Sequence, residues 1–409
     1  MSVPKLRFKE FDGDWSNKKI GNIASKVGSG STPRGGAEAY TDHGIIFIRS
    51  QNVNNDQLLL DDVAYIPEET HVKMSGSKVI ANDILLNITG ASIGRSCVVP
   101  HDFTEANVNQ HVCIIRTPND DPIFVQSFLS SENGQNVIQS KQAGGGREGL
   151  NFQAIRSIDF HFPPSKEEQT KIASFLSNVD KKISQLTQKH ALLSQYKQGM
   201  MQKLFSQQIR FKADDGSEFG AWKHCKLKDV LISYRLGGNY SNAEMVTSYP
   251  LIKMGNLGRG SINLDKIEYI PEDQIIDPED LIKKNDLFFN TRNTLDLVGK
   301  VALWRGELPI AYYNSNLLRL DFENNIFMNY LFNEQKTLEK LKAIASGTTS
   351  VAAIYTKDLL KINLEIPCLE EQNKIASFLS SIDQKIVVVA QQIEQAKQWK
   401  KGLLQQMFV

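Results

Sequence analysis

Residues 167–183 read EEQTKIASFLSNVDKKI, and residues 370–386 read EEQNKIASFLSSIDQKI. Thirteen of these 17 positions are identical at an offset of 203, and the register continues without a gap toward the end of the chain. A weaker echo precedes each copy, with YIPEE at 65–69 and YIPED at 269–273. This order indicates one duplication of about half the chain, because a solenoid would need three or more shorter repeats.

The duplicated segments carry the apolar pattern of coiled-coil helices. Apolar residues recur at alternating spacings of four and three from Ile172 to Leu204 and from Ile375 to Met407. Five consecutive heptads are typical of a coiled-coil seam, whereas a core helix of a large domain, the alternative, rarely keeps so narrow a stripe. The first stripe is interrupted by His190 and Lys197, which we interpret as register breaks or snorkelling side chains and not as ligands.

The rest of the chain has the composition of two globular blocks. Short β-like runs such as Ile45–Ile48 and Leu287–Asn290 are separated by Gly, Pro, Asn and Asp. Short helical patterns also occur, for example over Asn325–Ile344. We therefore predict an α+β fold in which each block is a globular α/β domain with long polar loops. The predicted segments are block one at 1–163, a helix at 164–208, block two at 209–366 and a helix at 367–409.

Composition excludes several classes of protein. Lys and Arg total 47 against 46 Asp and Glu, so the chain is no uniformly basic DNA-coating protein. The four cysteines are far apart, which excludes a disulfide scaffold and a Cys-rich zinc module. No stretch approaches the roughly 18 apolar residues that span a bilayer, and the first ten residues show no apolar signal region. We expect a cytoplasmic protein without a membrane partner.

No catalytic constellation is apparent in the sequence. It lacks a G-x-x-x-x-G-K-[ST] phosphate loop, an HExxH zinc pair and a G-x-S-x-G nucleophile elbow. The glycines of GGGREG at 144–149 favour a mobile loop over a phosphate site, because no Lys-Ser/Thr follows. We therefore expect no catalytic residue, cofactor or metal in this chain.

Recognition is the remaining class, because loops rich in Arg, Lys, Asn, Gln, Ser and Thr can reach the edges of bases. Such clusters recur at similar places in both blocks, although any one of them could be a turn or a capping loop. The candidates for DNA binding in block one are Arg49, Gln51, Asn52, Thr89, Ser92, Arg95, Asn109, Gln110 and Arg147. Those in block two are Lys253, Asn256, Arg259, Arg292, Asn293, Asn316, Thr348 and Thr349.

The chain resembles the DNA-specificity subunit of type I restriction-modification systems over essentially all 409 residues. The duplicated segments carry the resemblance, with their endings YKQGMMQKLF (196–205) and WKKGLLQQMF (399–408). The stretches SGSTPRGG, TGASIGRSCVV and NVNQHVCII of block one are similar to a first target-recognition domain. Block two departs, with TRNTLDLVGKVALW in place of TGASIGRSCVV, as expected if two half-sites differ.

The resemblance implies two pseudo-two-fold-related target-recognition domains, separated by a long antiparallel two-helix coiled coil. Each domain would read one half of a split site on double-stranded DNA. The subunit would not be catalytic itself. It would recruit two modification subunits, which carry S-adenosylmethionine and methylate adenine N6, and restriction subunits that use ATP and Mg.

Helix geometry gives a length to this arrangement. A seam of 33 residues at 1.5 Å per residue spans roughly 50 Å, or about 15 base pairs. Partner subunits are expected on exposed positions of the helices, although solvated charges and aromatics that seal the seam ends are the alternative. These candidates are Lys181, Lys182, Tyr196, Gln384, Lys385 and Trp399. A coiled-coil scaffold with two protein-binding heads is the competing function, and an autonomous nuclease comes third.

Overall fold

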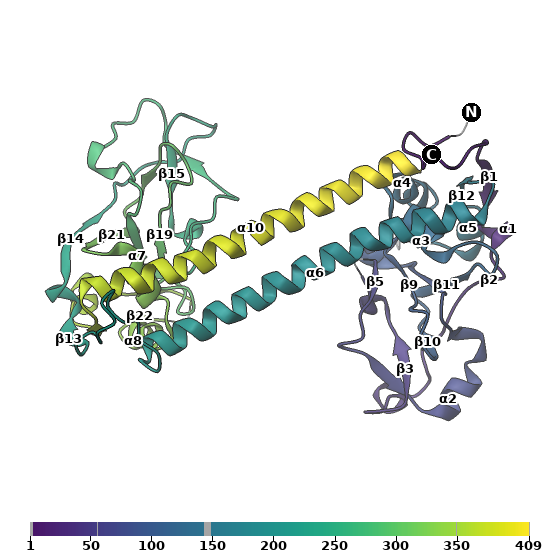
Figure 1. Cartoon of the computed structure of the whole chain (residues 1–409), viewed down its shortest axis with the longest axis horizontal. Coiled ribbons are helices and arrows are strands. Elements are labelled where there is room, and N and C mark those ends of the chain that lie inside the picture. Colours follow the sequence, from purple (N-terminus) through teal and green to yellow (C-terminus); the bar gives the residue numbers. More distant parts are fainter. Residues whose placement is uncertain (1–2, 55, 143–148, 349, 409) are drawn as a thin grey trace. The chain divides into compact units, whose positions relative to one another are not determined.

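The computed structural model describes residues 3–54, 56–142, 149–348 and 350–408. They form two compact units: unit 1 is Met1–Gln188 with Ala390–Val409, and unit 2 is Lys189–Val389. Two long helices, α6 (Lys166–Phe205) and α10 (Leu369–Met407), each run from one unit into the other (Figure 1). The units therefore cut across the predicted helical segments, because each unit takes half of both helices.

Unit 1 is built on two four-stranded sheets and two short strand pairs. In the first sheet every neighbouring pair is antiparallel, whereas β10 pairs in parallel with β3 in the second. The first sheet has the order β2 (Lys26–Ser29), β11 (Val112–Arg116), β8 (Ile84–Asn87), β9 (Ser96–Val98). The second has the order β6 (Ala64–Ile66), β3 (Ile45–Ile48), β10 (Ala106–Val108), β7 (Lys78–Val79). The remaining strands are β1 (Ser16–Lys19) with β12 (Asp159–Phe162), and β4 (Val53–Asn54) with β5 (Gln57–Leu58).

Unit 2 repeats this plan, which confirms that the duplication extends to the globular blocks. Its four-stranded sheet has the order β14 (Leu231–Leu236), β21 (Leu317–Phe322), β17 (Leu287–Asn290), β19 (Val301–Leu303). A second sheet has the order β16 (Glu268–Tyr269), β15 (Pro250–Ile252), β20 (Tyr312–Tyr313). The others are β13 (Lys223–Lys226) with β24 (Asn363–Ile366), and the sheet β18 (Arg292–Asn293), β23 (Ala352–Ala353), β22 (Ser346–Gly347).

Each unit also carries a matching pair of short helices. The sequence predicted one helical stretch over Asn325–Ile344, but the structure has two helices there. The second begins at Gln335, and the carboxylate of the preceding residue, Glu334, caps it by accepting the Thr337 amide at 2.7 Å. The pairs are α3 (Pro122–Ser130) with α4 (Glu132–Ser140), and α7 (Asn325–Phe332) with α8 (Gln335–Ala343). The short helices α1 (Ile20–Ile23), α2 (Glu68–Lys73), α5 (Phe152–Arg156) and α9 (Thr356–Leu359) complete the fold.

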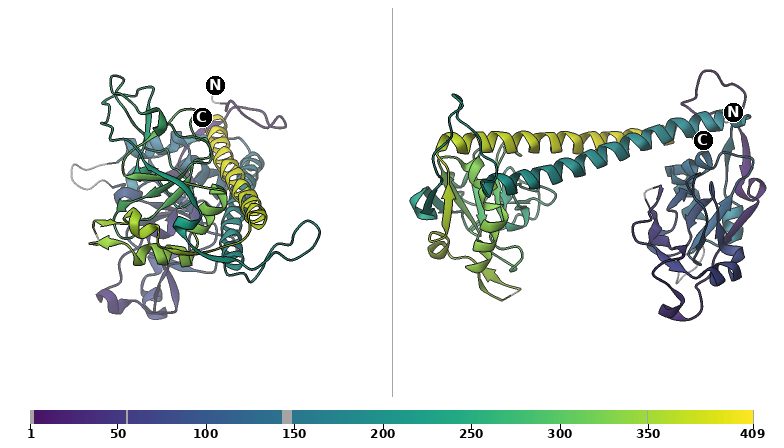
Figure 2. Two further views of the ribbon diagram at one scale, coloured as in Figure 1. Left: turned by 90° about the vertical axis from the view of Figure 1, so that its left-hand side faces the viewer. Right: turned by 60° about the horizontal axis from the view of Figure 1, so that its bottom comes forward.

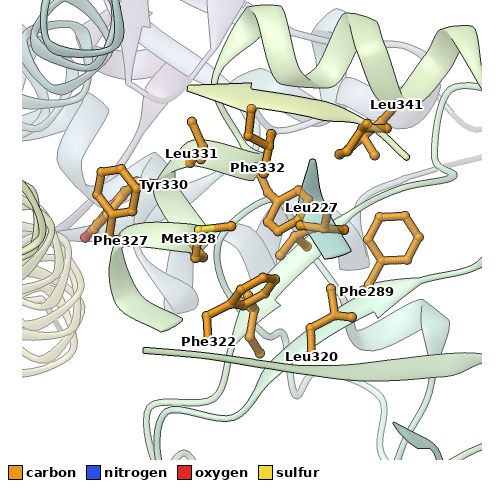
Figure 3. Close-up of a cluster of buried hydrophobic side chains, with 14 of the residues drawn as sticks. Leu227, Phe289, Leu320, Phe322, Phe327, Met328, Tyr330, Leu331, Phe332 and Leu341 are labelled. Carbon is orange, nitrogen blue, oxygen red and sulfur yellow. The ribbon is translucent and has the colours of Figure 1, made fainter. Parts of the chain in front are cut away.

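The core of each unit joins its sheet to its halves of the long helices. In unit 2, Phe289 and Leu320 of the sheet are buried with Phe327 of α7 and with Leu379 of α10 (Figure 3). In unit 1, Ile172, Leu176 and Val179 of α6 are buried in one cluster with the end of α10. The predicted seam positions close to each core are therefore buried, whereas those from His190 to Met200 are half-buried.

The long helices run antiparallel within each unit, since the start of one lies against the end of the other (Figure 2). This confirms the predicted fold class, two related α/β domains with an antiparallel helix pair.

A buried glutamate anchors the start of each long helix. Glu168 is 1% exposed and accepts two hydrogen bonds from Arg7, at 2.7 and 2.8 Å, and one from Trp15 at 3.3 Å. A charge this deeply buried is tolerated only when it is paired and fully hydrogen-bonded. The same arrangement recurs in unit 2 through Arg210, Trp222 and Glu371.

Candidate nucleic-acid interface

In each unit three loops far apart in sequence meet at one place, which we call the loop corner. In unit 1 it comprises residues 30–32, 88–89 and 109–111, and in unit 2 residues 237–239, 291–292 and 314–316. Main-chain bonds hold it together at equivalent positions. The amide of Ile88 donates to His111 O at 3.0 Å, and the amide of Thr291 donates to Asn316 O at 3.3 Å.

A glycine allows the first loop to approach the others closely. A Cβ on Gly30 would lie 1.6 Å from the carbonyl oxygen of Val108, and one on Gly237 would lie 2.2 Å from that of Tyr313. Real Cβ atoms essentially never approach another atom within 3.0 Å, so any side chain here would push the loops apart. The corner thus depends on glycine in both units.

An asparagine fixes the turn at the centre of each corner. The Asn109 Oδ1 accepts the amide of His111 at 2.9 Å, and the Asn314 Oδ1 accepts that of Asn316 at 3.3 Å. Both asparagines are 8% exposed. Because its Oδ1 is bonded to a backbone amide and its side chain is largely covered, Asn109 shapes the turn, and its selection as a DNA-contacting residue stays a prediction.

Four side chains form a hydrogen-bonded chain across the corner of unit 1. Thr32 Oγ1 donates to Gln110 Oε1 at 2.5 Å, Gln110 Nε2 lies 3.1 Å from His111 Nε2, and His111 Nδ1 lies 2.6 Å from Thr89 Oγ1. The sequence predicted Thr89 and Gln110 but missed Thr32 and His111. Both missed residues lie inside polar stretches that the sequence singled out, SGSTPRGG and NVNQHVCII.

The corner of unit 2 has the same main-chain frame and different side chains. Its four equivalent positions hold Asn239, Ser315, Asn316 and Arg292. The exposed Arg292 begins β18, in the same small sheet as the strand β22 that precedes the exposed Thr348. The structure therefore brings together four predicted residues of unit 2, which are Arg292, Asn293, Asn316 and Thr348.

Two other predicted asparagines are buried. Asn52 is 2% exposed, and its side chain accepts the Arg49 amide and donates to the Leu59 and Asp62 carbonyls at 3.0 and 2.8 Å. Asn256 makes the equivalent three bonds in unit 2. In this geometry both hold a loop in shape and cannot face a base edge.

The remaining candidates differ in whether their side chains already form hydrogen bonds within the protein. Gln51 donates to Asp62 at 2.8 Å, Lys253 is paired with Glu268 and Asn242, and Arg259 donates to the Asp296 carbonyl at 3.1 Å. The loop between β8 and β9 carries Ser92 and the exposed Arg95, close in sequence to Thr89. Two candidates, Arg147 and Thr349, lie outside the described residues.

The candidates for partner binding are on the surface of the long helices. The side chains of Lys181, Lys182, Gln384 and Lys385 are exposed. Tyr196 is 51% and Trp399 54% exposed, and the Trp399 ring packs edge-on against Phe175 at 6.0 Å. The positions are accessible, and a role in partner binding stays a prediction.

Lys197 has a role that the sequence did not predict. Its Nζ lies 2.5 Å from Asp383 Oδ1 on the facing helix, so it is a paired charge and not a break in the register. The duplicate pair in unit 1 is Lys400 with Asp180, at 2.7 Å, and Lys400 also reaches Asp56 at 2.9 Å. Burial by itself lowers the pKa of Lys400, but the two carboxylates outweigh it and raise that pKa.

The part of the chain that the structure describes contains neither a metal-binding cluster nor a membrane-spanning helix. Within it, no group of three or more His, Cys, Asp or Glu side chains could hold a metal ion. No described helix is both long enough and apolar enough to cross a membrane.

The family model of the type I restriction modification DNA specificity domain matches the chain twice, at residues 12–195 and 220–398. The chain belongs to this family. Each match covers one globular block and most of the helix that follows it, so the specificity domain is the duplicated element. Membership does not favour the alternative of a scaffold that binds no DNA.

Relatives agree with this assignment, and solved structures share the fold. The specificity subunit of the type I restriction enzyme MjaVIII of Methanocaldococcus jannaschii is 26% identical over 350 residues, covering 81% of this chain and 80% of the relative. That of Escherichia coli EcoBI is 29% identical over 152 residues, 34% of this chain and 31% of the relative. A crystal structure of the type I S subunit from M. genitalium matches with a TM-score of 0.60 at 15% identity, over 100% of this chain and 99% of that one. A structure from a study of type I complex assembly matches with a TM-score of 0.55, over 97% of this chain and 98% of that one.

Proposed function

We propose that this chain reads a bipartite site on double-stranded DNA, with the loop corner of each unit facing one half-site. The observation that carries the proposal is the shared main-chain frame with different side chains. Equivalent main-chain bonds, from Ile88 to His111 and from Thr291 to Asn316, join the second and third loops of both corners. On this frame Thr32, Gln110 and His111 are replaced by Asn239, Ser315 and Asn316. Side chains that vary on a fixed frame are what two different base readers require.

The chain acts as an adaptor and is not catalytic by itself. Two modification subunits, which would supply S-adenosylmethionine and methylate adenine N6, dock on the long helices. Restriction subunits, which would supply ATP and Mg chemistry, complete a nuclease. Support comes from the relatives, which are named as specificity subunits of type I restriction enzymes. The exposed Tyr196 and Trp399, with Lys182 and Lys385, are the proposed docking positions.

Cytoplasmic localisation belongs to the same proposal, because DNA and the partner subunits are found there. In such binding, phosphate contacts supply affinity, whereas sequence is read by polar side chains on base edges.

The test is co-expression of the full chain with a type I modification subunit, followed by sequencing of methylated bases in the host genome. We expect one motif with two defined half-sites, separated by unspecified bases and methylated on adenine. A complex that forms but methylates no bipartite motif would contradict the proposal. A complex with the modification subunit that persists after nuclease treatment and does not bind DNA would favour the scaffold.

A further inference from the structure

The hydrogen-bonded chain in the corner of unit 1 has one direction of proton donation. Gln110 Nε2 is an amide nitrogen and can only donate, so His111 Nε2 must accept. A neutral His111 then carries its proton on Nδ1, which donates to Thr89 Oγ1. At the other end, the Thr32 hydroxyl donates to Gln110 Oε1. In this arrangement the oxygen of the Gln110 amide faces Thr32 and its nitrogen faces His111, so the two partners hold the amide in place.

An exposed glutamine held in this way presents a fixed pattern to a ligand. Gln110 has two lone pairs on Oε1 and two N–H groups on Nε2, and each atom uses one of these within the corner. One acceptor and one donor remain, and among the described residues no further partner for them is recorded. In the major groove, adenine offers the complementary pair, the N7 acceptor and the N6 donor.

We infer that Gln110 reads one adenine of the half-site faced by unit 1, and that Thr32 and His111 are positioning residues that hold its amide in the reading orientation. This inference rests on the proposed function and makes it more specific. Without the two flanking partners the exposed amide could rotate by half a turn and present donor and acceptor in the opposite order, which matches adenine no longer. The duplicate position in unit 2 holds Ser315, so that unit reads its half-site differently.

The test compares methylated motifs of full-length variants, each co-expressed with the modification subunit. For Gln110→Ala we expect one adenine position to become degenerate, with discrimination at that position falling about 5- to 150-fold and all other positions unchanged. Gln139→Ala, an exposed glutamine on α4 and outside the three loops of the corner, is the matched control and should keep the parental motif.

Thr32 provides the second measurement. Thr32→Val keeps the shape of the side chain and removes the hydroxyl, so it should relax the same adenine position, whereas Thr32→Ser keeps the hydroxyl and should restore it.

An unchanged motif in active Gln110→Ala would overturn the inference and leave the proposed function intact. Absence of any bipartite motif with the parental chain would instead defeat the proposed function. If Gln110→Ala gives no methylation, the deciding measurement is binding of the purified variant complex to two duplexes that differ only at the adenine. A variant that distinguishes the two duplexes as strongly as the parental complex does would overturn the inference.

Discussion

Lys400 Nζ lies 2.7 Å from Asp180 Oδ1 on the facing long helix. The equivalent pair in the other repeat, at the sequence offset of 203, is Lys197 with Asp383. A charged pair at a seam position favours the one register in which the two charges meet. In unit 1 the same lysine also binds Asp56, in the turn between β4 and β5, so it ties both helices to the globular block.

We expect Lys400→Met to destabilise the protein by about 1–2 kcal/mol, because Asp180 and Asp56 would lose their shared cation in a partly covered site. Urea unfolding of the parental chain and the variant measures this. Lys397→Met is the control, since Lys397 pairs with Glu394 on the surface of its own helix, where such pairs contribute less than about 0.5 kcal/mol. Equal midpoints for the two variants would contradict a structural role for Lys400.

Gly30→Ala should open the loop corner of unit 1, because the added Cβ would collide with the carbonyl oxygen of Val108. We expect a loss of about 1–3 kcal/mol and a clear loss of methylation at cognate sites. The neighbouring Gly28→Ala is the control, because a Cβ there would meet no atom within 4 Å. The idea fails if both variants methylate as the parent does.

Arg292→Ala should weaken methylation of cognate sites, since Arg292 is the exposed cation of the unit 2 corner and a good base contact contributes about 1–3 kcal/mol. The measurement is the extent of methylation at a limiting concentration of complex. Lys336→Ala, an exposed cation on α8, should leave it unchanged. Near-parental methylation by Arg292→Ala would remove this residue from the site.

Removing one heptad from both long helices should shorten the unspecified spacer and keep the half-sites. Deleting 183–189 and 386–392 retains Asp180 and Asp383 together with their lysines, and preserves the spacing of the seam. Seven residues correspond to roughly 10 Å, or about three base pairs. Altered half-sites with an unchanged spacer would refute the idea that the helices set the distance. A deletion in α6 alone is the control and should abolish methylation, because the seams no longer match.

The seam could be predicted because its evidence is local: apolar residues at Ile172, Leu176 and Val179 reveal one helix face directly. The duplication then predicted the second helix and a second globular block related to the first. Burial of polar loop residues could not be predicted in this way. In the run Arg49-Ser50-Gln51-Asn52 nothing in the residue types shows that Asn52 turns inward, because an asparagine that caps a loop and one that reads a base have the same chemistry.

Only half of the four hydrogen-bonded residues in the unit 1 corner could be predicted, for a related reason. Thr32, Thr89 and His111 belong to separate loops, and only the sheet order places these loops together. Lys197 was misinterpreted because its partner, Asp383, comes from the other repeat. Both cases depend on contacts between distant parts of the chain, which periodicity cannot report.

The two loop corners separate the energetics of folding from those of recognition. Each is closed by peptide groups, a glycine and an inward asparagine, so exchanging the outward side chains leaves these bonds in place, although in unit 1 it breaks the side-chain hydrogen bonds across the corner. Mutations that change the base preference of such a protein should therefore carry little thermodynamic penalty. New specificities can then arise by ordinary point substitution, without compensating changes elsewhere in the chain.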